Sequence, residues 1–165
     1  MVDELRELYD YNTWANGRIF DAASKLSTEQ FNQTVPGSFP SVRETLRHIL
    51  AAEWIWLSRW KGESPSAIPA EWDTSTMEGI RSHWEENTKN LITFVRGLSA
   101  SDVQRSVTYR SIKGDSFTNT MSQILRHLVN HSTYHRGQIV NMLRNLGSDG
   151  VGTDMIIYFR EQQKN

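Results

Sequence analysis

The stretch TMSQILRHLVNHSTYHRGQIVNMLRNLG, residues 120–147, carries the longest helical pattern in the chain. Its apolar and histidine positions recur every three or four residues, which places them on one helix face. That face carries Ile124, Leu128, His131, His135, Gln138 and Met142. Gly147 is a typical helix stop. At about 1.5 Å per residue, the helix would be roughly 40 Å long, enough to run the length of a helical bundle.

Three other segments show the same helical periodicity. They are residues 3–26, 41–61 and 76–98. Asp3 is the expected N-cap of the first segment. Ser41 and Ser75 each stand three residues before a glutamate, which is the spacing of a capping box, so they are the expected N-caps of the other two.

The connections between these helices differ in kind. Residues 27–40 and 62–74 are rich in proline, glycine and serine, and we predict loops there. Residues 106–118, SVTYRSIKGDSFT, alternate and then turn at Lys-Gly-Asp, which predicts a small β-hairpin. A short helix is expected from about Thr153. Residues 1–165 therefore predict a single all-α domain, a four-helix bundle with a hairpin between the third and fourth long helices and a short C-terminal helix.

Composition excludes several classes of protein. The 19 acidic and 18 basic side chains nearly cancel, so we expect no nucleic-acid partner. No apolar run is long enough to span a bilayer, and the acidic start MVDELRELYDYN lacks the apolar core of a secretory signal. We therefore expect a cytoplasmic protein with no membrane partner. The absence of cysteine excludes disulfides, thiolate metal ligands and a cysteine nucleophile.

The histidines of residues 127–138 are candidate metal ligands. His131 and His135 are four residues apart, so both side chains lie on one helix face. The residues between them include no glutamate, which argues against a zinc protease of the H-E-x-x-H type. His48 on the second helix could supply a third imidazole, and three histidines leave a coordination position open. His127 is also four residues from His131, so spacing alone does not decide which pair binds. The alternative is that these histidines are hydrogen-bonded core residues.

Several polar side chains have two possible roles each. Glu44 is expected to cap the second helix, and the alternative is that it binds the metal or contacts one of its ligands. Asn12 and Asn16 either form an interhelical hydrogen bond or line a polar cavity. Gln138 continues the histidine face, where it would orient a ligand, and Tyr134 stands at the edge of that face. We take Asn12, Tyr134 and Gln138 as a candidate pocket.

Three stretches resemble the DinB family, named for DNA-damage-inducible B proteins. They are YNTWAN at 11–16, RETLRHILAAEWIWLSRWKG at 43–62 and NHSTYHRGQIVNMLRNLG at 130–147. The resemblance covers nearly the whole chain. It implies a four-helix bundle that binds a divalent metal through His48, His131 and His135, with His127 a structural neighbour one turn too early. It also implies a homodimer.

The resemblance implies less about the reaction. Relatives include S-transferases that use a low-molecular-weight thiol such as bacillithiol or mycothiol. Because this chain has no cysteine, the sulfur would come from a thiol cosubstrate acting on a small-molecule substrate. We therefore expect a metal-dependent thiol S-transferase. A non-catalytic metal-binding stress-response protein and a metal-dependent hydrolase are the alternatives. Zinc is the first metal expected, and nickel and iron also suit imidazole ligands.

Overall fold

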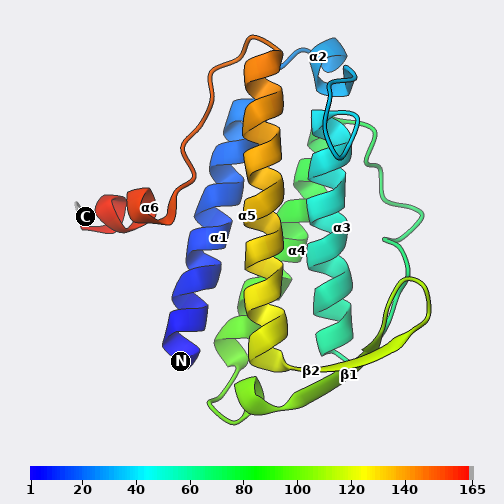
Figure 1. The fold of residues 1–165 in the computed structure, drawn as a ribbon, viewed down its shortest axis with the longest axis vertical. Coiled ribbons are helices and arrows are strands. Elements are labelled where there is room, and N and C mark those ends of the chain that lie inside the picture. The colour runs from blue at the N-terminus through cyan, green and yellow to red at the C-terminus, as the bar shows by residue number, and fades with distance from the viewer. Residues whose placement is uncertain (164–165) are drawn as a thin grey trace.

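Four long helices form the body of the molecule, as the sequence predicts (Figure 1). The computed structural model describes residues 1–163. The helices are α1 (Val2–Ala23), α3 (Val42–Trp60), α4 (Met77–Gly97) and α5 (Met121–Asn145). α5 packs between α1 and α3, and α4 packs against the same two helices from the opposite side. The predicted four-helix bundle is therefore confirmed.

The long connection between α3 and α4 determines which helices of the bundle run parallel. α1 and α5 run in the same direction and lie side by side. Tyr9 Oη of α1 donates a hydrogen bond to the Leu125 carbonyl of α5 at 3.1 Å. α4 runs the opposite way, which brings its end to the start of α1, where Arg6 donates to the Leu98 carbonyl at 2.9 Å. α3 and α4 are parallel because residues 61–76 return along the outside of the bundle before α4 begins (Figure 1).

The helix caps were only partly predicted. Ser41 Oγ accepts from the Glu44 backbone N–H at 3.2 Å, but the Glu44 carboxylate pairs with Arg43 at 2.8 Å instead of completing the capping box. The prediction for Ser75 is wrong, because Thr76 caps α4 through the Gly79 N–H at 3.0 Å.

The prediction for Asp3 as an N-cap is also wrong. α1 begins directly after Met1, and Asp3 lies in its first turn. A carboxylate in the first turn still interacts favourably with the helix dipole. Asp3 therefore marks the start of the helix, although it is not the N-cap.

The hairpin and the C-terminal helix confirm the predictions, and two shorter elements were missed. β1 (Ser106–Arg110) and β2 (Ser116–Thr120) form the antiparallel hairpin, which turns at Gly114 with φ +93°. α6 (Met155–Gln162) is the short C-terminal helix. α2 (Thr28–Asn32) occupies part of the predicted loop 27–40, and η1 (Asp102–Gln104) is a short 3₁₀ turn. A single turn such as α2 leaves almost no periodicity to detect.

The core consists of two apolar clusters separated by polar residues. One cluster includes Leu5, Trp60 and Leu125, and the other includes Ile19, Ile49 and Met142. The buried polar residues between them are Asn12, Asn16, Glu53, Ser132, His135 and Arg136. The candidate site lies at this middle level of the bundle. Within residues 1–163, no helix is both long and apolar enough to cross a membrane.

Candidate metal centre

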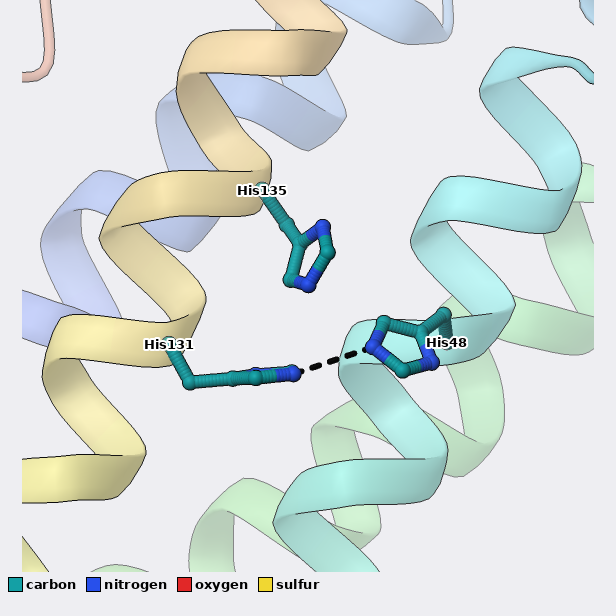
Figure 2. A group of neighbouring side chains, drawn as sticks. All are labelled: His48, His131 and His135. Atoms are coloured by element: carbon teal, nitrogen blue, oxygen red, sulfur yellow. Dashed lines mark hydrogen bonds between the residues drawn. The ribbon is translucent and has the colours of Figure 1, made fainter. Parts of the chain in front are cut away.

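Three histidines from two helices meet at the middle of the bundle. His48 lies on α3, while His131 and His135 lie one turn apart on the antiparallel neighbour α5. Figure 2 shows the three rings pointing toward one another. One ring nitrogen from each lies within 4.8 Å of the others. The structure thus brings together the three residues that the family resemblance implies, whereas spacing alone had left His127 as an alternative to His135.

The nitrogen spacing is close to what a single ion requires. His48 Nε2 and His131 Nε2 are 2.9 Å apart. Two imidazole nitrogens on one tetrahedral zinc, each about 2.0–2.1 Å from it, would be about 3.3 Å apart. After a small outward movement of the rings, these two nitrogens would therefore be spaced to share one ion.

The hydrogen bonds of His135 orient its free lone pair. His135 Nδ1 lies 2.8 Å from Gln138 Oε1, and Gln138 Nε2 donates to Ser38 Oγ at 2.9 Å. Because the Gln138 carbonyl oxygen can only accept, His135 Nδ1 carries the proton. His135 Nε2 is then left with its lone pair free. Metal-bound histidines in proteins are usually held in this way by a neighbouring acceptor.

Two of the three imidazoles are strongly biased toward the neutral form. Burial, with a smaller contribution from the neighbouring His135, lowers the pKa of His48 to about 4. Burial also lowers the pKa of His131 to about 3, with smaller contributions from His135, His48 and His127. At neutral pH both rings are uncharged. They can therefore coordinate a cation without first releasing a proton.

A cavity of about 360 Å³ opens beside His48 and His131. It lies between α3 and α5 and is bordered by residues 66–68 and by Ile112 at the hairpin tip. Aromatic and aliphatic side chains form much of its wall, including Phe39 and Trp56. A small organic molecule would fit beside the histidines, because ligand pockets typically have volumes of a few hundred Å³.

His127 lies outside the group of three but on the wall of the same cavity. Its ring is exposed and packs edge-on against Trp56, with centroids 5.5 Å apart. Glu44 lines the cavity as well, and it is held by Arg43 at 2.8 Å and Arg47 at 3.6 Å. Neither side chain contributes to the cluster of ring nitrogens.

The structure separates the three residues of the candidate pocket. Gln138 contacts His135, as described above. Tyr134 is 62% exposed, with its ring edge-on to His135 at 5.0 Å, so it stands outside the bundle beside the site. Asn12 is buried on α1, where its amide donates to Glu53 Oε1 at 3.0 Å. Asn12 and Asn16 therefore form interhelical hydrogen bonds, the first of their two predicted readings.

A buried ionic network behind the histidines was missed by the sequence reasoning. Asn12, Asn16 and Ser132 all donate to Glu53 Oε1. Arg136, 0% exposed, donates to Asn12 Oδ1 at 2.6 Å and to Asn16 Oδ1. Burial raises the pKa of Glu53, against the lowering effect of these hydrogen bonds and of Arg136.

One feature of the sequence could have revealed this network, namely a charged residue inside an apolar run. Glu53 follows Ala51 and Ala52 and precedes Trp54 on a helix that reads as buried. In the structure, Ser132 and Arg136 each follow a histidine of the site directly in sequence. The network thereby anchors the two turns of α5 that carry those histidines.

Comparison with known proteins gives one consistent family. The family model described as "DinB family" matches residues 1–165. The chain is 27% identical to "Protein DinB" of Bacillus subtilis over 165 residues, covering 96% of this chain and 95% of that protein.

Solved structures share the fold at lower identity. A DinB-like protein of Bacillus cereus has a TM-score of 0.66 at 17% identity, covering 85% of this chain and 91% of its own. YfiT of Bacillus subtilis, described as a probable metal-dependent hydrolase with an unusual four-helix bundle topology, has a TM-score of 0.65 at 17% identity, covering 88% and 87%. With its whole length matched by the family model, this chain belongs to the DinB family.

Proposed function

We propose that the chain binds one divalent metal ion through His48, His131 and His135 and uses it in catalysis on a small molecule. The observation that carries this proposal is the convergence of three ring nitrogens within 4.8 Å, beside a cavity of about 360 Å³. Three imidazoles are a catalytic rather than a structural zinc set, because the fourth position stays open. Zinc is the first metal expected, with nickel and iron as alternatives.

The residues around the histidines suit such an ion. Gln138 holds the Nδ1 proton of His135, and the lowered pKa values of His48 and His131 keep those rings neutral. When bound, the ion would supply Lewis acidity that lowers the pKa of a thiol or a water molecule at the open position. The apolar wall at Phe39 and Trp56 would limit water around the reacting atoms.

Transfer of a thiol sulfur is the first reaction we propose. The chain contains no cysteine, so the sulfur comes from a low-molecular-weight thiol cosubstrate. In the balanced step, a carbon–sulfur bond forms on an electrophilic carbon and the bond to its leaving group breaks. The thiol proton passes to solvent, and the leaving group departs as an anion.

Hydrolysis is the second candidate, because the structural relative YfiT is described as a probable metal-dependent hydrolase. The same histidines and the same open position serve both reactions. The two differ only in whether the nucleophile is a thiol or water.

The first test is the metal content of untagged protein, measured by elemental analysis. His48→Ala and His131→Ala should bind metal at least about 100-fold more weakly, since loss of an outer-shell contact alone costs about 10–100-fold. His127→Ala is the matched control from the same helix face and should retain the ion. Full metal occupancy in His131→Ala would overturn the ligand assignment.

The second test asks whether the site is open. The cobalt-substituted protein is titrated with N-acetylcysteine and should develop a thiolate-to-cobalt absorption band. It should then accelerate the reaction of that thiol with monochlorobimane, releasing chloride. A cobalt spectrum that no thiol changes would favour the non-catalytic metal-binding alternative. A thiolate-to-cobalt band without faster reaction of the thiol with monochlorobimane would favour hydrolysis.

A further inference from the structure

The cavity beside the histidines contains a buried cation with no anionic partner. Arg59 is 6% exposed and lines this cavity. Across residues 1–163, no ion pair involves Arg59, and its Nε is buried without a hydrogen-bond partner. An unpaired buried charge is costly, because the interior does not replace the lost hydration. Arg59 is therefore available to bind an anion.

The surroundings hold the Arg59 guanidinium in place without neutralising it. Its Cζ lies 4.5 Å from the centre of the Trp56 ring and 5.1 Å from that of Tyr109. Aromatic faces attract a cation and fix its orientation, but they leave its N–H groups free to donate. The contacts come from α3 and from β1, so the hairpin helps to position this charge.

The other charges on the cavity wall are already paired. Glu44 lies 2.8 Å from Arg43 and 3.6 Å from Arg47. Arg47 is the second arginine that lines the cavity, but it is about half exposed and engaged with Glu44. Arg59 thus differs from Arg47 in both burial and pairing.

The position of Arg59 sets the length of a ligand that could contact both Arg59 and the histidines. His48 and Arg59 stand on the same helix, about three turns or about 16 Å apart along its axis. The Arg59 side chain leans back over Trp56, which shortens the gap between them. The wall between includes Ile55 and Ile68, so the middle of the cavity favours an apolar chain.

We propose that this cavity binds an elongated organic carboxylate, with the carboxylate on Arg59 and the apolar chain along Trp56, Ile55 and Ile68. The planar guanidinium fork matches a carboxylate, and one cation balances one negative charge. The other end of the molecule reaches His48 and His131. That end rests on the proposed function, whereas the carboxylate subsite does not.

The test compares hexanoate with its neutral analogue hexanamide, titrated by calorimetry into metal-free and zinc-loaded protein. Wild type should bind hexanoate at least about tenfold more tightly, because a hydrogen bond to a charged group is worth more than a neutral one. Arg59→Met should remove the preference. Arg47→Met, which deletes a positive charge from the same cavity, should keep it.

Two outcomes would overturn the proposal. One is equal binding of the two probes by wild type, and the other is equal loss of the preference in both arginine variants. If Arg59→Met does not fold by circular dichroism, Arg59→Gln replaces it with the same expected loss.

The ω-mercapto derivative of hexanoate separates this inference from the proposed function. It should bind the zinc-loaded protein more tightly than hexanoate does, and this gain should vanish in metal-free protein. A preference for hexanoate without any gain from the thiol would leave the carboxylate subsite standing and contradict thiol binding at the metal.

Discussion

At the scale of single residues, Gln138 connects the histidine face to the loop before α3. It accepts from His135 at 2.8 Å and donates to Ser38 at 2.9 Å, so its amide is oriented at both ends. The expectation that Gln138 would orient a ligand came from its place on the helix stripe. The structure adds the identity of the ring that it contacts and the loop residue that holds it.

We predict that Gln138→Leu weakens metal binding by about 10–100-fold, because His135 loses the acceptor that holds its Nδ1 proton. Competition with a chromogenic chelator measures the change. Gln138→Glu is the matched control, since it keeps an acceptor at the same position and should bind within a few-fold of wild type. Equal affinity of the leucine variant would contradict this role.

At the scale of elements, α1, α3 and α5 are joined by the Glu53–Arg136 network. The two charged groups are linked through Asn12 and Asn16 on α1. Burial raises the pKa of Glu53 and lowers the pKa of Arg136, so each charged form depends on these partners. The network replaces apolar packing at the level of the histidines, between the two apolar clusters.

Arg136→Met should lower the free energy of unfolding by about 3–5 kcal/mol, because it leaves the Glu53 carboxylate buried without a cation. Urea unfolding of the metal-free protein measures this loss. The double variant Glu53→Met and Arg136→Met should lose less than the sum of the single variants. Arg126→Met on the exposed side of α5 is the control and should change stability by about 0.5 kcal/mol or less. Strict additivity of the two core variants would contradict the coupling.

Local sequence predicted the elements more reliably than their ends. The long helices, the hairpin and α6 all follow from periodicity and turn residues that lie close together in the chain. The caps at Asp3 and Ser75 were misplaced by one or two residues. α1 begins after Met1 without a side-chain cap, and Thr76, which neighbours Ser75, can fill the same role. α2 is too short to show a period.

At the scale of the whole molecule, folding changes the pH at which His48 and His131 take up a proton. Between about pH 6.5 and about pH 4 both are mostly protonated in the unfolded chain but still mostly uncharged in the folded one. Their pKa values in the fold are about 4 and about 3, below the ordinary histidine value of 6.5. Below pH 6.5, the unfolded chain therefore binds more protons than the folded chain. Stability then falls as the pH falls.

The midpoint of thermal unfolding of the metal-free protein should decrease between about pH 6.5 and about pH 3, the folded pKa of His131, with the histidine contribution levelling off below that range. Melting curves at stepped pH measure this change. His131→Leu should show a shallower decrease over the same window, because one of the two lowered groups is gone. Zinc should deepen the dependence in wild type, since protons compete with the ion for the same nitrogens. An identical slope in His131→Leu would contradict the assignment.

By itself, the sequence determined the helices, the hairpin and the face that carries His131 and His135, because these depend on residues a few positions apart. The DinB resemblance, which is also a property of the sequence, selected His131 and His135 rather than His127 as the pair that joins His48. Only the tertiary structure decided that α3 and α4 run parallel, that Arg136 is buried behind the site, and that Arg59 faces the same cavity as His48. Those features depend on packing between distant segments, where burial and the choice of partner have no local signature.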